Sequence, residues 1–409
     1  MNDSLERPVS REAREEQRQG SVLIDKLADW LMQRALGECD LATLLQGCCE
    51  RLHAAGVPVS RVHIAYRTLH PVMQAMGLRW RRGQGIETLA FRHADAPDEF
   101  RRSPQYAMIQ SGVDLMRRRL VGPEAETDFE MLAQLKAEGY TDYLGFVQAF
   151  DTQAREGIIG SWVSSRPEGF SETDVAALLR IQQRLAVAFK VMIREQITFN
   201  VVDTYLGPAA GRQVLSGQIQ RGDHESFHAV IWYGDLRHST HMSETLSPDA
   251  YLAVLNAYFD CTAGAVIAEG GEVLLLLGDA VLAIFRIRDG NTGAAAERAF
   301  AATVRAQETM ADLNRSRQST GAVPLAFGVG LHVGEVMFGN IGVPERLQFT
   351  VIGSAVNEVA RLEGLTKELD RPVLASRAFV ALCGGEWQPL GHFPRPGVPE
   401  PLEVLAPKR

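Results

Sequence analysis

Residues 272–285, EVLLLLGDAVLAIF, consist of two apolar runs joined by a Gly-Asp dipeptide. Apolar runs of this length on either side of a turn dipeptide are typical of a tight β-hairpin. A further apolar run at residues 227–235, FHAVIWYGD, also ends on an aspartate. The sequence therefore predicts three strands, with Asp235 at the end of the first and Asp279 in the turn between the other two.

The segments around these strands predict the fold. Helical patterns at residues 248–268 and 294–314 alternate with the strands, and another strand is expected at residues 325–333. The resulting order, βαββαβ, is that of the ferredoxin-like fold, in which helices cover one face of an antiparallel sheet. We therefore expect an α+β protein whose C-terminal domain has this fold.

In a ferredoxin-like sheet, the end of the first strand and the turn of the central hairpin are neighbours. Asp235 and Asp279 would repel each other there unless a divalent cation neutralised both of them. Mg²⁺ or Mn²⁺ held by two carboxylates and by substrate phosphates is the usual arrangement for phosphoryl chemistry. The alternative is that each aspartate is only a turn residue, because Gly-Asp is common in turns.

Four segments of the C-terminal half, taken together and in their order along the chain, indicate a family. They are WYGDLRHST at 232–240, GGEVLLLLGDAVLAIF at 270–285, GVGLHVGEVMFGNIG at 328–342 and LQFTVIGSAVNEVARLEGL at 347–365. Together with the closing segment at 390–407, this series resembles the class III adenylate/guanylate cyclase catalytic domain. The resemblance covers about 185 residues, and it implies a cyclase domain at 223–409.

The resemblance implies roles for individual residues. Asp235, Leu236 and Asp279 match the metal-binding positions, which implies two divalent cations, Mg²⁺ or Mn²⁺, per active site. Asn357 and Arg361 match the pair that orients the ribose and stabilises charge on the phosphates, and their spacing of four puts them on one helix face. The family forms its sites between two protomers, so a homodimer is expected to cyclise a nucleoside triphosphate to a 3′,5′-cyclic nucleotide and pyrophosphate.

The positions that select the base depart from the family pattern. Leu275 stands where adenylate cyclases usually have lysine, and Thr350 matches a subgroup that carries threonine. Leucine forms no hydrogen bond with a base, so discrimination is expected to fall by about tenfold. We expect ATP as the substrate. The alternatives are a cyclase of another base (GTP or a pyrimidine nucleotide) and a catalytically weak, dimerising regulatory module.

Other positions around the expected site are also unusual. His238 and Ser239 replace the Gly-Phe that is common in the family, and Pro396 stands where a phosphate-binding lysine often lies. Arg395, beside Pro396, and Arg371 are candidate phosphate contacts.

The N-terminal part predicts a sensor domain at residues 21–170, after a flexible arm at 1–20 that lacks periodic apolar positions. Two amphipathic helices are expected between Leu23 and Ala55, followed by antiparallel strands near 62–66, 76–80, 143–150 and 157–163. The segment GIIGSWVSSRPEGFSETDVAALL at 157–179 resembles the end of a GAF domain, and the ligand of such a sensor is not specified by the sequence.

Residues 171–222 predict a helical connector and hinge. Ser171 is expected to cap the helix, with Asp174 three residues later. The apolar stripe that follows fits either a helix packed on its own domain or a parallel connector between protomers. Glycines between Gly207 and Gly222 suggest the hinge.

Composition limits the classes of partner. The net charge of −8 argues against nucleic acid or an anionic membrane as the main partner. Purely apolar runs such as Val273–Leu277 are far shorter than the roughly 20 residues that span a bilayer. Five cysteines without ligand spacing and a polar N-terminus suggest a reducing cytoplasm.

Overall fold

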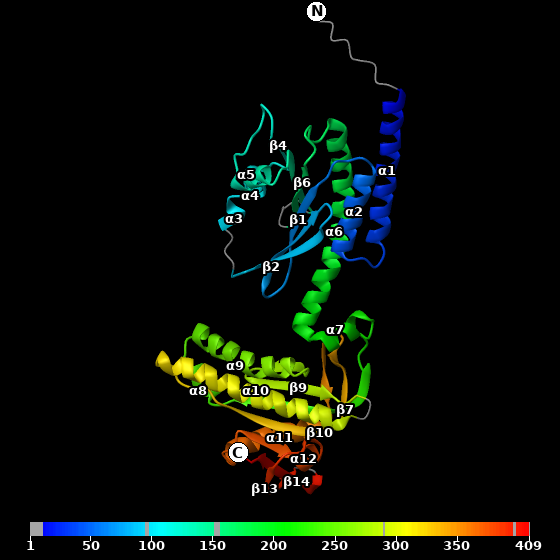
Figure 1. Ribbon diagram of the computed structural model, residues 1–409. Helices are drawn as coiled ribbons and strands as arrows, with labels where there is room; N and C mark the ends of the chain where they lie inside the picture. Colours follow the sequence, from blue (N-terminus) through cyan, green and yellow to red (C-terminus); the bar gives the residue numbers. More distant parts are fainter. Residues whose placement is uncertain (1–10, 95–97, 151–155, 289–290, 396–397, 409) are drawn as a thin grey trace, which may run out of the picture. The chain divides into compact units, whose positions relative to one another are not determined.

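The computed structural model describes residues 11–94, 98–150, 156–288, 291–395 and 398–408. The chain divides into two compact units, Met1–Val201 and Val202–Arg409. This boundary falls inside the segment 171–222, for which the connector is predicted. Each unit combines helices with a sheet (Figure 1), which is antiparallel except for the parallel pair β10–β12 in the C-terminal unit, so the α+β class is confirmed.

The N-terminal unit contains a six-stranded sheet of order β3-β2-β1-β6-β5-β4. Its strands are β1 (Arg61–Arg67), β2 (Met73–Arg81), β3 (Gly85–Arg92), β4 (Leu115–Arg119), β5 (Asp142–Ala149) and β6 (Gly157–Ser164). Its helices are α1 (Arg11–Ala35), α2 (Leu41–Ala54), α3 (Asp98–Arg101), α4 (Pro104–Ser111), α5 (Glu130–Ala137) and the long α6 (Glu172–Leu206).

The two faces of this sheet are covered differently. Helices α1, α2 and α6 bury one face in a single apolar core, which contains Ile64, Trp80 and Trp162 from the strands. On the other face, α5 packs its Leu132 and Leu135 against Tyr143 and Val163. The first face therefore packs into a hydrophobic core. On the second face, the apolar packing is at strands β5 and β6.

The structure corrects the predicted N-terminal boundaries. Residues 11–20, predicted as part of a flexible arm, begin helix α1, and residues 1–10 lie outside the described residues. The four predicted strands correspond to β1, β2, β5 and β6, whereas β3 and β4 were missed. Strand β3 was missed because many of its side chains are exposed and it lacks a clear alternating pattern. The GAF assignment stays a prediction.

Helix α6 begins with the predicted capping arrangement. The amide of Asp174 donates to Ser171 Oγ at 3.1 Å, and the amide of Ser171 donates to Asp174 Oδ2 at 2.8 Å. Its first half, with buried residues from Leu178 to Ile193, belongs to the core of the N-terminal unit. This half of the apolar stripe therefore packs on its own domain.

The C-terminal unit contains an eight-stranded sheet of order β13-β14-β12-β10-β7-β9-β8, with β11 paired to β10. Its strands are β7 (His224–Leu236), β8 (Glu272–Leu277), β9 (Ala280–Arg286), β10 (Phe327–Val343), β11 (Arg346–Ile352), β12 (Val373–Ser376), β13 (Trp387–Arg395) and β14 (Val398–Pro407). Its helices are α7 (Pro208–Leu215), α8 (Ser239–Thr245), α9 (Pro248–Ala268), α10 (Thr292–Ser319), α11 (Ser354–Glu368) and α12 (Arg377–Cys383).

The segments β7-α9-β8-β9-α10-β10 reproduce the predicted βαββαβ order, and their strands lie in the order β10-β7-β9-β8. Strand β7 is apolar at successive positions because both of its faces are buried. Val230 and Trp232 face helices α9 and α10, whereas Ala229 and Ile231 join a second cluster with Val359 of α11. The sequence run at 227–235 thus reads as continuous rather than alternating.

Two further findings concern the remaining helices. The predicted hinge at 207–222 contains helix α7, whose Ala210 is buried against the sheet, so this segment is partly a packed element. Within the described residues, α9 alone is long and apolar enough to cross a membrane by composition. It packs against α10 and contributes Val254, Tyr258 and Val266 to the core, as a core helix of that composition does.

Close packing of α11 on β10 depends on Gly330. A Cβ at this position would lie 2.5 Å from the main-chain oxygen of Val359 and 2.8 Å from the main-chain nitrogen of Glu363. Any side chain at Gly330 would therefore push the helix away from the strand.

We expect Gly330→Ala to lower the free energy of unfolding of the C-terminal unit by about 1–3 kcal/mol, the usual cost of overpacking. Urea unfolding followed by circular dichroism would measure it. Gly364→Ala is the matched control, because nothing lies within 4 Å of its Cβ position. It should preserve or raise stability, since alanine favours helix. Equal losses in the two variants would contradict the close-approach argument.

Candidate active site

Two carboxylates meet at one end of the C-terminal sheet. Asp235 lies near the end of β7, opposite Ala280 of β9. The main-chain nitrogen of Leu236 donates to the main-chain oxygen of Asp279 at 3.3 Å, which holds the β8–β9 turn beside the end of β7. Burial raises the pKa of Asp235, Lys367 opposes this shift, and the Asp279 carboxylate adds to it. The two aspartates predicted from strand order are thus neighbours.

Helix α11 brings a cation to this pair. Lys367 Nζ donates to Asp235 Oδ2 at 2.6 Å, and the lysine side chain is 51% exposed while that of Asp235 is 16% exposed. The ion pair therefore sits at the mouth of the site, with the carboxylate on the inside. It joins residues that are 132 positions apart in the sequence.

A second acid lies deeper, beneath Asp235. Glu363 is buried, and burial, followed by the charge on Asp235, raises the pKa of Glu363. Arg237 lies with its Nη1 3.7 Å from Glu363 Oε1 and donates to Thr366 Oγ1 at 2.5 Å. Lys367, Glu363 and Arg237 were not predicted from the sequence. The available signal was the Glu363/Lys367 spacing of four on one helix, which by itself suggests only a surface pair.

Asn357 and Arg361 lie one turn apart on α11. Asn357 is exposed and Arg361 is half-buried, whereas Ala355, Val359 and Leu362 face the core. Arg361 Nε is shielded from solvent and has no hydrogen-bond partner in the described part of the chain. Within this part of a single chain, neither side chain is bonded to the aspartates, and Lys367 is the residue of α11 that reaches Asp235.

Comparison with known proteins agrees with this arrangement. Residues 223–373 match the family described as Adenylate and Guanylate cyclase catalytic domain. Residues 223–373 form a class III nucleotide cyclase catalytic domain.

Individual relatives resemble the chain in this region. Adenylate cyclase 1 of Rhizobium meliloti (strain 1021) is 32% identical over 174 residues, which cover 42% of this chain and 26% of that protein. An adenylate cyclase of Anabaena cylindrica is 36% identical over 155 residues, covering 37% of this chain and 30% of the relative. The solved structure of the guanylyl cyclase Cya2 is 29% identical, with 46% of this chain and 93% of that one covered at a TM-score of 0.39. The chain thus spans less than a third of the length of the two curated relatives.

The donors at the edge of the cyclase domain fit a divalent cation. No group of three or more His, Cys, Asp or Glu side chains able to hold a metal occurs in the described ranges. Asp235 and Asp279 supply two carboxylates, and the Leu236 side chain is buried, so only the main chain of Leu236 is available at this point. Two carboxylates with remaining positions left for phosphates and water suit Mg²⁺, which rarely takes an all-protein cage.

The two positions predicted to select the base lie on strands β8 and β11. Leu275, on β8, packs with Leu274 against the cluster that contains Leu282 and Val351. Thr350, on β11, is buried, and its Oγ1 has no hydrogen-bond partner in the described residues. Strands β8 and β11 contact each other. One position is therefore apolar and packed, and the other offers a shielded hydroxyl that can donate or accept.

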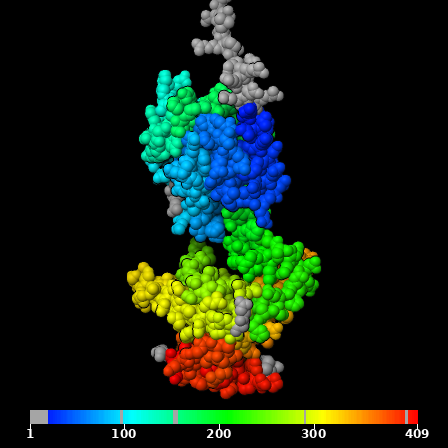
Figure 2. Space-filling model, turned by 45° about the vertical axis from the view of Figure 1, so that its right-hand side comes forward, coloured from blue at the N-terminus to red at the C-terminus, as the bar shows by residue number. Residues whose placement is uncertain are grey.

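The two candidate phosphate contacts differ in their surroundings. Arg371 is exposed after α11. Arg395 of β13 instead donates through Nη1 to Glu358 Oε1 at 2.6 Å and through Nε to the main-chain oxygen of Glu400 at 2.7 Å. It therefore braces α11 beside Asn357 and is not brought to the aspartates. The residues of β13 and β14, coloured red, lie at the surface of the C-terminal unit on the face that Figure 2 shows, and Pro396 lies outside the described residues.

The turn after Asp235 shows what the histidine at position 238 costs, where the family commonly has glycine. His238 has a φ of 61°, in the left-handed region that favours glycine. A glycine at this position would adopt the same turn without a Cβ penalty. The histidine therefore carries a local backbone cost directly before helix α8.

A metal at the two carboxylates should be visible without catalysis. We expect millimolar Mn²⁺ to raise the melting temperature of the wild-type protein and to leave that of Asp235→Asn unchanged, because binding to the native state stabilises it. Without metal, Asp235→Asn should be at least as stable as the wild type, since it removes a half-buried charge beside Asp279. Asp260→Asn, at an exposed position of α9, is the control and should respond like the wild type. An undiminished Mn²⁺ effect in Asp235→Asn would contradict the assignment.

Proposed function

We propose that this protein is a homodimeric adenylate cyclase, which converts ATP to 3′,5′-cyclic AMP and pyrophosphate under the control of its N-terminal unit, in the cytoplasm. The observation that carries the proposal is the meeting of Asp235 and Asp279 at one edge of a cyclase domain whose α11 presents Asn357 and Arg361. Adenylate cyclases among the relatives, at 32% and 36% identity, support ATP as the substrate.

The placement of Asn357 and Arg361 on α11 supports a shared site. An amide that orients a ribose and a guanidinium that meets phosphate charge both need to face the substrate. In one chain Asn357 is exposed, Arg361 is half-buried, and neither is bonded to the aspartates, while Lys367 of the same helix offsets part of the charge on Asp235. A second protomer, offering its α11 to the aspartates of the first, would complete the site, and the two-fold symmetry would make two such sites.

The chemistry is an intramolecular substitution. The ribose 3′-oxygen bonds to the α-phosphorus, the bond from that phosphorus to the β-phosphate oxygen breaks, pyrophosphate leaves, and the 3′-hydroxyl proton passes to solvent. Bound Mg²⁺ or Mn²⁺ would supply positive charge at the 3′-oxygen and the phosphates. Asp235 and Asp279 would hold these ions, Asn357 would fix the ribose for in-line attack, and Arg361 would stabilise charge on the phosphates.

A second candidate follows from Leu275. This side chain is packed among apolar neighbours, so it offers adenine no hydrogen bond, while the unpartnered Thr350 hydroxyl suits several bases. A cyclase of GTP or of a pyrimidine nucleotide would have the same fold and the same metal site.

Incubating the purified protein with ATP, GTP, CTP or UTP and Mn²⁺ tests base choice. We expect cyclic AMP as the main product, with a preference over the other bases of about tenfold or less, because one polar contact is missing. Leu275→Lys should raise the preference for ATP, and Leu275→Met is the apolar control. A main product from another base would replace ATP while keeping the enzyme class. No cyclic product from any nucleotide would leave a non-catalytic dimerising module.

Mixing two inactive variants tests the shared site. Asp235→Ala and Arg361→Ala should each lower activity by at least about 10²-fold. A 1:1 mixture should recover up to about a quarter of the wild-type rate, since half of the dimers are mixed and each holds one intact site. Light scattering would verify that both variants dimerise. If dimeric variants failed to recover activity on mixing, the site would lie within one protomer.

A further inference from the structure

The second face of the N-terminal sheet carries a group of basic residues that has no role in the proposed reaction. We call Arg61 and His63 of β1 and Arg79 and Arg81 of β2 the basic cluster. The two strands are antiparallel, and their register puts Arg61 directly opposite Arg81 and His63 directly opposite Arg79. Side chains at directly opposite positions are about 5 Å apart at Cβ, so the four residues form one patch.

The cluster is electrostatically unbalanced. Like charges directly opposite each other destabilise a sheet. In the described residues, the ion pair formed by these arginines is the one from Arg79 Nη1 to Glu87 Oε2 at 3.2 Å, and that glutamate side chain is 55% exposed. The Nε atoms of Arg61, Arg79 and Arg81 are shielded from solvent and have no hydrogen-bond partner in the same residues. Unpaired, shielded donors of this kind are costly unless something else satisfies them.

His63 lies in the middle of the patch. Burial, followed by the charges on Arg79 and Arg61, lowers the pKa of His63 to about 4. The ring is therefore neutral at pH 7, and its Nε2 is also shielded and without a partner. Gly77 lies beside it, where a Cβ would be 3.3 Å from His63 Nε2 and 3.2 Å from the ring of Phe91. Phe91, which is 38% exposed, thus forms an apolar border to the basic cluster.

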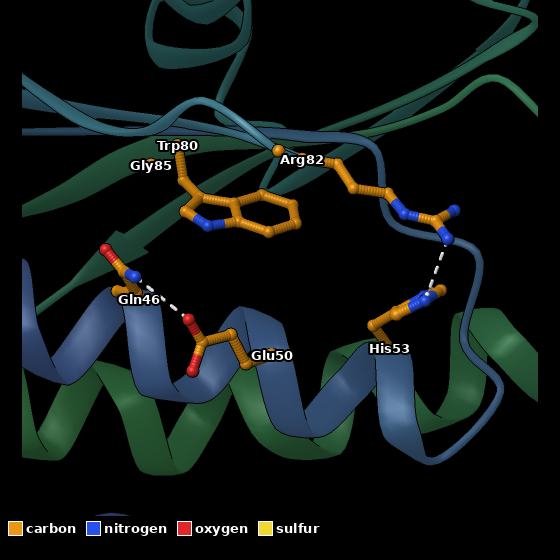
Figure 3. A pocket seen from close by; sticks show the side chains of 7 residues that line it. Gln46, Glu50, His53, Trp80, Arg82 and Gly85 are labelled. Atoms are coloured by element: carbon orange, nitrogen blue, oxygen red, sulfur yellow. Dashed lines mark hydrogen bonds between the residues drawn. The ribbon is translucent and has the colours of Figure 1, made fainter.

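A nearby hollow in the same unit shows the contrast. It measures about 360 Å³ and lies between α2 and the β2–β3 turn (Figure 3). Its polar side chains satisfy one another, since Gln46 Nε2 donates to Glu50 Oε1 at 2.9 Å and Arg82 Nη2 lies 2.9 Å from His53 Nε2. These polar groups of the hollow are thus paired with one another, whereas each residue of the basic cluster has a shielded nitrogen without a partner in the described residues.

We propose that the basic cluster binds a small organic anion, whose carboxylate or phosphate group is held by Arg61, His63, Arg79 and Arg81. Guanidinium groups match such anions with paired hydrogen bonds, and three of them against Glu87 and the more distant Glu138 leave a net positive charge. Phe91 and Leu89 of β3, which lie near Gly77 of β2, would contact the organic part of the molecule. The basic cluster would then be the input site of the N-terminal unit. Binding of the anion does not depend on the cyclase reaction.

Calorimetric titration of the full-length protein with sodium phosphate, acetate and benzoate tests the proposal, with ionic strength held constant by sodium chloride. We expect saturable binding that is weakened about tenfold or more in Arg61→Gln and in Arg79→Gln, because each loses a hydrogen-bonded charge pair. Arg101→Gln, at an exposed position of α3, should bind like the wild type. Both cluster variants remove like-charge repulsion, so they should fold, and Arg61→Lys, which keeps the charge but not the fork, should bind with intermediate affinity.

The three probes also identify the class of anion. Benzoate bound more tightly than acetate indicates a carboxylate with an apolar body, and phosphate bound more tightly than both indicates a phosphate-bearing molecule. The proposal is wrong if none of the three binds above the chloride background, or if Arg101→Gln loses as much affinity as the cluster variants. Because binding is measured directly, either result leaves the proposed cyclase activity unaffected.

Discussion

The repulsion between Asp235 and Asp279, at one half-buried edge of the C-terminal sheet, is the constraint on which the arrangement of the cyclase domain depends. Two carboxylates at such a place need positive charge nearby. Within the chain, Lys367 supplies part of it at 2.6 Å from Asp235. The rest of the negative charge of the two carboxylates is uncompensated, which makes the pair suitable for a divalent cation together with a polyphosphate. A helix that carried no cation to this edge would leave the apo domain with an uncompensated charge.

Helix α11 serves this edge and the expected dimer at once. Its C-terminal turns bring Glu363 and Lys367 to Asp235, while its N-terminal turns display Asn357 and Arg361 away from the core. Two features fix the position of α11. The helix packs closely on β10 at Gly330, and Glu358 of the helix forms an ion pair with Arg395 of β13. Glu358 also lies 3.3 Å from His332 Nε2. A shift of α11 would therefore disturb the aspartates and the Asn/Arg pair together.

The two sheets of the protein use their faces in different ways. Strand β7 is buried on both faces from Ala229 onward and carries Asp235 near the end of this buried part. Strands β1 and β2 bury one face under three helices and carry three arginines and a histidine on the other. Charge at the end of a buried strand serves a site at the sheet edge, whereas charge along a face forms a patch. The two units thus offer two kinds of site, one acidic and one basic.

The sequence by itself determined the elements whose pattern is local. Burial of β7 and β9 on both faces made their apolar runs continuous. Asp235 marked the end of the first run, Asp279 marked the turn between β8 and β9, and Ser171 with Asp174 predicted the start of α6. The spacing of Asn357 and Arg361 likewise needed only the helical repeat. The exposed strand β3 and the short helix α7 within a glycine-containing segment had no such pattern and were missed.

Only the tertiary structure decided which side chains meet. Lys367 reaches Asp235 across 132 residues, and Arg395 pairs with Glu358 across 37, although its sequence position suggested a phosphate contact. The direct opposition of Arg61 and Arg81 follows from the register of β1 with β2. Periodicity records which face of an element is buried, but partners far apart in sequence are chosen by strand register and helix packing, which no local pattern encodes.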